Sequence, residues 1–142
     1  MLIGEYLHTI DNKRRLSIPV KFRADLGPRA VLTKGIDICL TLYPLPVWER
    51  KVQKLESLPS QAEARDFVRV ILSGAVEVEL DKLGRILIPD YLKEYARLEK
   101  NVAILGLSNS IEIWNADLWQ ERRRKAEAEV GELVEKLREL GI

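Results

Sequence analysis

A nine-residue stretch occurs twice in this 142-residue chain, and this duplication limits the possible folds more than any other feature of the sequence. The first copy runs from Asp11 to Pro19, and the second runs from Asp81 to Pro89, 70 positions later. Each copy has an Asp, an Arg four positions further on, an apolar residue, one variable position, and then Ile and Pro. Two copies are too few for a solenoid, which needs at least about three. We therefore expect a single domain with pseudo-two-fold symmetry.

Matched apolar and aromatic positions extend the repeat to roughly residues 4–48 and 74–119. Hydrophobic alternation, turn residues and prolines predict the same order in each half: strand, hairpin tip, strand, short helix, strand, strand. Asn12 and Gly84 are expected to supply the positive backbone φ that each loop needs. The expected elements lie at 2–11, 16–18, 19–26, 30–34 and 37–43, and again at 74–81, 86–88, 89–97, 102–106 and 110–114.

The segments outside the repeat are expected to be helical. Residues 49–73 should form connecting helices, and residues 115–140 predict one long helix with Asn115 as its N-cap. The long helix carries a narrow apolar seam with alternating spacings of four and three positions, at Ala126, Val130, Leu133, Leu137 and Leu140. Such a seam suits packing on the chain's own core or on another subunit. We thus expect a β-rich α+β fold divided into residues 1–48, 49–73, 74–119 and 120–142.

The composition argues against several classes of protein. Cys39 is the only cysteine and His8 the only histidine, so we expect no intramolecular disulfide and no metal site. The sequence has no nucleophile with a base partner, no phosphate-binding loop and no dinucleotide-binding motif. We therefore expect no catalytic residues, no cofactor and no small-molecule substrate. No apolar stretch approaches the ~20 residues of a membrane span and no signal peptide is apparent, which predicts a soluble cytoplasmic protein.

Positive charge gathers in the first repeat, although the formal net charge of the chain is only +1. Residues 8–23 contain five cations and one anion, whereas the matching residues 78–93 contain three of each. Cations crowded together without counter-charges favour a polyanionic partner. We expect the first repeat to dominate a contact with double-stranded DNA.

The candidate DNA-binding residues are the cations of the two loops: Lys13, Arg14, Arg15, Lys82 and Arg85. An arginine at a loop can bind phosphates, or can contact O6 and N7 of guanine through two hydrogen bonds. Alternatively, each arginine pairs with the aspartate four positions before it, Asp11 or Asp81, and only locks the turn. Both interpretations hold together if the aspartate orients the loop while the arginine points outward.

The doubled motif resembles that of the MraZ family of bacterial transcriptional regulators, as do Gly4-Glu5-Tyr6 and the His8-x-Ile-Asp11 segment that follows. The resemblance covers nearly the entire chain. It implies two AbrB-type (SpoVT-like) swapped-hairpin halves, fused in one chain around an intertwined β-barrel-like core. It also implies a ring-shaped, octamer-like homo-oligomer in the nucleoid, which binds short direct repeats and represses the division and cell-wall gene cluster.

In that family the residues that contact DNA would correspond to Arg15 and Arg85, with Lys13 and Arg14 beside the first. The second motif departs from the first in charge, because Leu83 and Gly84 stand where the first copy has Lys13 and Arg14. A second hypothesis makes the chain a protein-binding module, such as an antitoxin-like partner protein, that engages through its C-terminal helix. That hypothesis uses the helix seam and leaves the basic loops without a role.

Overall fold

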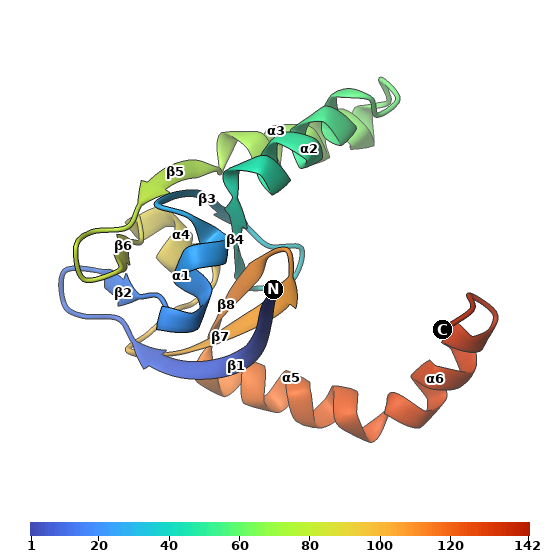
Figure 1. The fold of residues 1–142 in the computed structure, drawn as a ribbon. Coiled ribbons are helices and arrows are strands. Elements are labelled where there is room, and N and C mark those ends of the chain that lie inside the picture. Colours follow the sequence, from blue (N-terminus) through green and yellow to red (C-terminus); the bar gives the residue numbers. More distant parts are fainter.

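The computed structural model describes residues 1–142 and contains a six-stranded antiparallel sheet, a two-stranded ribbon and six helices (Figure 1). The fold is α+β and β-rich, as predicted, and the two halves repeat one order of elements. The first half comprises β1 (Leu2–Thr9), β2 (Arg15–Ser17), α1 (Val20–Leu26), β3 (Arg29–Lys34) and β4 (Leu40–Pro44). The second half comprises β5 (Val76–Glu79), β6 (Arg85–Leu87), α4 (Asp90–Tyr95), β7 (Asn101–Ser108) and β8 (Ile111–Asn115).

The two halves exchange strands. The order in the large sheet is β1-β7-β8-β4-β3-β5, so the first strand of each half pairs with the third strand of the other half. The order is symmetric about the β8–β4 pair at its centre. β2 and β6 leave this sheet and pair with each other, and we call this pair the ribbon. The hairpin expected within each half is reduced in the first half to a single bridge between Ile10 and Leu16. Neither half therefore contains a complete set of strand partners.

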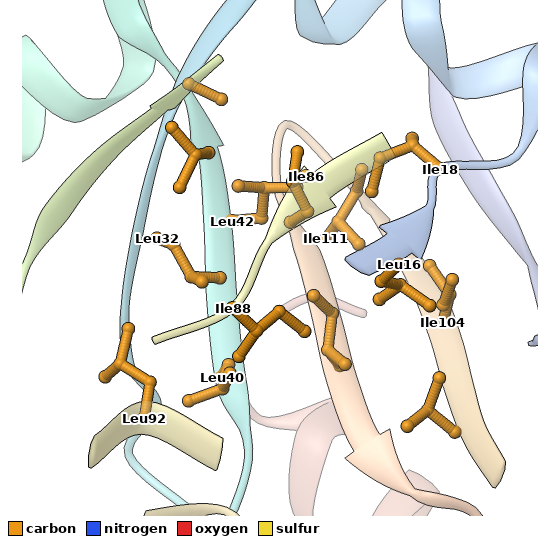
Figure 2. Packing of buried hydrophobic residues seen from close by; sticks show 14 of the residues in the cluster. Leu16, Ile18, Leu32, Leu40, Leu42, Ile86, Ile88, Leu92, Ile104 and Ile111 are labelled. Atoms are coloured by element: carbon orange, nitrogen blue, oxygen red, sulfur yellow. The ribbon is translucent and has the colours of Figure 1, made fainter. Parts of the chain in front are cut away.

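Burial of the repeated apolar residues holds the ribbon against the large sheet. Leu16 and Ile18 of the first copy, and Ile86 and Ile88 of the second, are all at most 1% exposed. Figure 2 shows these side chains in one cluster with residues of the large sheet such as Leu42. Fully burying an aliphatic side chain of this size contributes about 1.5–3 kcal/mol. The apolar positions of the nine-residue motif thus form the inner layer of the core.

The connecting helices α2 (Leu45–Glu56) and α3 (Ala62–Ser73) lie side by side and project from the sheet (Figure 1). The predicted helical connection between the halves is therefore confirmed. The loops before β2 and β6 lie at the opposite end of the molecule from these two helices (Figure 1).

The C-terminal segment forms two helices, α5 (Ala116–Ala128) and α6 (Val130–Arg138). The prediction of one continuous helix is wrong, because the backbone leaves the helical conformation at Glu129, with φ −99° and ψ 1°. Gly131, a poor helix former, follows the break. The predicted N-cap is confirmed, since the Asn115 side chain accepts hydrogen bonds from the backbone N–H groups of Asp117 and Leu118. None of the helices has the length and apolar character needed to cross a membrane.

Candidate nucleic-acid interface

Two loops of matching geometry, residues 10–14 (the first loop) and 80–84 (the second loop), lead into the ribbon. Asp11 begins the turn of the first loop, and its Oδ1 accepts hydrogen bonds from the backbone N–H groups of Lys13 and Arg15, both at 2.9 Å. Asp81 does the same for Leu83 and Arg85, again at 2.9 Å. A short carboxylate can make such bonds to its own chain two residues on, which is why aspartate suits this position.

Each motif arginine pairs with its own aspartate and still has donors to spare. Nε of Arg15 lies 2.7 Å from Oδ2 of Asp11, and Nε of Arg85 lies 2.8 Å from Oδ2 of Asp81. A guanidinium carries five N–H donors, and in both arginines only the Nε donor is used in a hydrogen bond within the chain. Four donors of each therefore remain for a ligand. The ion pair with aspartate holds the arginine without using up its binding capacity.

The residue with positive φ in the first loop is Arg14, at 60°, and not Asn12 as the sequence suggested. It occupies the place that Gly84, with φ 75°, holds in the second loop. The Arg14 side chain then reaches into the other half. Its Nε donates to the carbonyl oxygen of Ile88 at 3.2 Å, and its Nη1 donates to Asp90 at 3.1 Å. Arg14 thus lies beside the candidate site and also links the two halves of the chain.

The corresponding contact on the other side comes from a different position in the chain. Nε of Arg23, in α1, donates to the carbonyl oxygen of Ile18 at 2.9 Å. Ile18 is the counterpart of Ile88, so Arg23 bonds the carbonyl group equivalent to the one that Arg14 bonds, although this bond lies within the first half. The Arg23 guanidinium fills the space where a side chain at position 84 would begin. Glycine suits position 84 because of its positive φ, and a larger residue there would have to displace the end of the Arg23 side chain.

These crossed contacts redistribute charge between the loops. Arg23 belongs to the first repeat but lies beside the second loop, whereas Asp90 belongs to the second repeat but pairs with the first loop. The first loop and the carboxylate that pairs with it carry three cations and two carboxylates: Lys13, Arg14, Arg15, Asp11 and Asp90. Lys93, Glu99 and Lys100 line a pocket beside this loop. The second loop, with the guanidinium beside it, carries three cations and one carboxylate: Arg23, Lys82, Arg85 and Asp81. These contacts weaken the charge argument for a dominant first loop, which stays a prediction.

The ribbon brings the two motif arginines onto one surface. In its antiparallel register Arg15 faces Leu87 and Ser17 faces Arg85, with Leu16 opposite Ile86 between them. Because successive residues of a strand point to opposite faces, the buried Leu16–Ile86 pair leaves the other four side chains on the outward face. Arg15 and Arg85 are diagonal neighbours there, with α-carbons about 7–8 Å apart. The sequence alone did not indicate that the two copies meet in one ribbon.

Two of the four cations at residues 122–125 have carboxylate partners within the chain. Arg122 pairs with Asp37 at 3.3 Å and lies over the ring of Trp114. Arg123 pairs with Glu5 at 2.8 Å and attaches α5 to β1. The positive charge of this basic run is therefore partly neutralised within the chain.

The only cysteine of the chain lies outside this interface. Cys39 is fully buried in a small core cluster with Ala103, Leu105 and Trp114. Burial raises the pKa of its thiol to about 12. No group of three or more His, Cys, Asp or Glu side chains is placed to hold a metal ion.

The loop aspartates predict a specific acid sensitivity. The pKa of Asp11 is lowered first by the hydrogen bond from the backbone N–H of Arg15, and that of Asp81 by the same bond from Arg85. A lowered folded-state pKa means that the stabilisation is complete above the ordinary value of 3.8 and is lost as the pH falls below it. We expect the unfolding free energy of the wild type to fall more steeply below about pH 4 than that of an Asp11→Asn, Asp81→Asn variant. Denaturant titrations at several pH values would measure this, and parallel curves would contradict it.

The whole chain is similar to known proteins. The sequence model of the family described as "MraZ protein, putative antitoxin-like" matches residues 1–70 and again residues 71–137. A protein named "Transcriptional regulator MraZ" from Pelotomaculum thermopropionicum is 53% identical over 143 aligned positions, covering 100% of this chain and 99% of the relative. Proteins of the same name from Desulfitobacterium hafniense (strain Y51) and Moorella thermoacetica are 51% and 50% identical, with full coverage of both chains. The two matched segments correspond to the two halves that exchange strands.

Proposed function

The chain belongs to the MraZ family of DNA-binding transcriptional regulators, and we propose that it represses the division and cell-wall gene cluster by binding short direct repeats in its promoter. In this proposal the protein acts in the nucleoid as a ring-shaped homo-oligomer and performs no catalysis. The DNA-binding residues are Lys13, Arg14, Arg15, Lys82 and Arg85, and Asp11 and Asp81 orient the loops.

The outward face of the ribbon is the observation that carries the proposal. A two-stranded antiparallel ribbon fits the major groove of B-form DNA, where an arginine can contact O6 and N7 of guanine through two hydrogen bonds. Arg15 and Arg85 lie on this one face and have unused guanidinium donors. Lys13 and Lys82, at the tips of the loops on either side, are free of ion pairs and suit phosphate contacts. Base contacts and positioning contacts are thus available on one surface.

Assembly into a ring is supported by the shape of the protein and by its exposed apolar residues. α6 extends away from the sheet (Figure 1), and its apolar residues Val130, Leu133, Val134 and Leu137 remain exposed in a single chain, as does Leu140 just beyond its end. Contiguous apolar surface of this kind commonly marks an interface. Head-to-tail contacts between subunits close into rings, which present identical surfaces in a repeated orientation. Such an array suits direct repeats in DNA.

The same exposed stripe on α6 also favours the second candidate function, a protein-binding module that engages a partner through this helix. In that case the partner would cover α6, and promoter DNA would not be bound specifically. The first function is preferred because it also accounts for the arginines of the ribbon.

A salt titration tests the proposal. The two loop lysines, Lys13 and Lys82, each contacting a phosphate, predict a slope of log K against log salt of about −1.8 for each bound subunit, and thus a roughly tenfold loss of affinity per subunit between 50 and 200 mM salt. Gel shifts with DNA from upstream of the division and cell-wall gene cluster would measure this loss. Replacing Lys13 and Lys82 by alanine should reduce the slope by about two. Lys54→Ala, on the distant helix α2, is the matched control and should leave it unchanged. Absence of specific binding at either salt concentration would reject the proposal in favour of the partner-protein alternative.

A further inference from the structure

The outward face of the ribbon is not chemically symmetric. The pseudo-two-fold relation places the two arginines at equivalent positions, but it also relates Ser17 to Leu87. Ser17 has a side-chain hydroxyl that makes no hydrogen bond within the chain, whereas Leu87 is a large apolar side chain that is 52% exposed. Leu87 lies directly across from Arg15, and Ser17 directly across from Arg85. An apolar group and a polar group therefore occupy matching places between the same two cations.

The loops also differ by a polar residue in the first half and an apolar residue in the second. Lys13 in the first loop corresponds to Leu83 in the second, and Leu83 is 63% exposed. Asn12 in the first loop corresponds to Lys82 in the second. Arg14 and Gly84 also differ, but they contribute less, because Arg14 is engaged by the other half and Gly84 has no side chain. A lysine at a loop tip contacts phosphates, which carry no sequence information directly. Differences in base recognition between the two halves therefore fall mainly on Ser17 and Leu87.

We propose that Leu87 contacts the 5-methyl group of a thymine in the major groove while Ser17 hydrogen-bonds a base on the other side of the ribbon, and that this pair fixes the direction in which each subunit lies on its repeat. Apolar side chains recognise thymine by its methyl group, and serine can donate to or accept from base edges. The inference rests on the proposed function, since it concerns the same ribbon and the same DNA.

Ser17 and Leu87 are needed to define the orientation of the ribbon on DNA, because the other residues of its outward face are symmetric. Asp11 with Arg15 and Asp81 with Arg85 form equivalent units, so a ribbon with only these residues would fit the groove equally well in either of two orientations. Direct repeats all run the same way along the DNA, and every subunit of a ring must meet its repeat in one orientation. The Ser17 and Leu87 pair distinguishes the two orientations.

Thymine-to-deoxyuridine substitution tests this contact, because it removes only the 5-methyl group. Duplexes are first selected by the full-length wild-type protein from a library with a randomised central region. Each thymine of the selected repeat is then replaced singly, and affinities are measured by fluorescence anisotropy. We expect one thymine per repeat at which loss of the methyl group weakens wild-type binding about three- to fivefold. Leu87→Ser, which removes the apolar group, should bind more weakly overall and show no loss at that position.

Controls separate this contact from general effects of mutation. Leu107→Ser changes another exposed leucine, which lies at the far end of β7, and Leu83→Ser changes the leucine of the second loop. Both should keep the sensitivity to the methyl group, and circular dichroism and light scattering should show unchanged folding and assembly for all variants. The exchange variant S17L with L87S should move the sensitive thymine to the opposite side of the repeat.

The outcomes distinguish the inference from the proposed function. If the wild-type protein selects no sequence from the library, the proposed function itself fails. If it selects a sequence but no thymine is sensitive, or if the Leu87 variants stay as sensitive as the wild type, DNA binding stands and the role of Leu87 is wrong.

Discussion

An operator shortened from several direct repeats to one is expected to bind the assembled protein about 10²–10⁴-fold more weakly. The reason lies in the small number of loop and ribbon cations on each subunit. Lys13, Arg15, Lys82 and Arg85 can make only a few phosphate or base contacts, and such a set gives weak binding near physiological salt. When one subunit of a ring is bound, the next ribbon meets its repeat at a high effective concentration, and affinity rises without a new kind of contact.

Titration of duplexes that carry one, two, three or four repeats would measure this effect, with light scattering to give the mass of the protein. Total duplex length should be held constant with unrelated flanking sequence, so that non-specific binding is the same in all four. A monomer that binds one repeat tightly, or an oligomer that binds one repeat as well as four, would contradict the prediction.

Replacing both motif arginines, Arg15→Ala with Arg85→Ala, is expected to weaken specific binding by about 2–6 kcal/mol. Loss of each bidentate arginine–guanine contact costs about 1–3 kcal/mol. The single variants should lose similar amounts, because the crossed contacts of Arg23 and Asp90 leave the first loop without an excess of charge over the second. Competition binding against unrelated DNA would separate specific from non-specific affinity. A much larger loss from Arg15→Ala alone would support the idea of a dominant first loop.

The aspartate variants provide the matched control for the double arginine variant. Asparagine at positions 11 and 81 retains an oxygen that can accept the backbone hydrogen bonds, but it removes the ion pair with each arginine. If the arginines only lock the turns, Asp11→Asn with Asp81→Asn should weaken binding as much as the arginine variant. If the arginines contact DNA, the aspartate variant should bind as well as the wild type or better, because two negative charges near the phosphates are gone.

The sequence predicted those parts of the fold that depend on neighbouring residues. The alternation of Leu16 with Ile18 and the cap at Asn115 are local patterns, and both were confirmed. The duplication added the symmetry of the two halves. The exchange of β1 and β5 between halves came only from the family resemblance, since hydrophobic alternation shows that a strand has a buried face but not which strand lies beside it.

The parts that could not be predicted involve contacts between residues distant in the sequence. Arg14 with positive φ contradicts the usual preference for glycine or asparagine, and its contacts with Ile88 and Asp90 span more than 70 positions. Arg23 lies on a helix, where its pattern is that of any exposed cation, and only the packed structure places it beside Gly84. The break at Glu129 was also missed, because the apolar seam continues across it. The closeness of Arg15 to Arg85 could not be predicted either, because it depends on the register in which β2 pairs with β6.

The exchange of strands also governs when the molecule becomes functional during its synthesis. β1 is among the first segments to leave the ribosome, but its partner β7 is complete only when Ser108 has been added. At about 5–20 residues per second, the first strand waits roughly 5–20 s for its place in the sheet. The ribbon likewise cannot form before β6 exists, so a chain interrupted in its first half has the first motif but no surface for the major groove. Only chains translated well beyond their midpoint can therefore present the proposed DNA-binding surface.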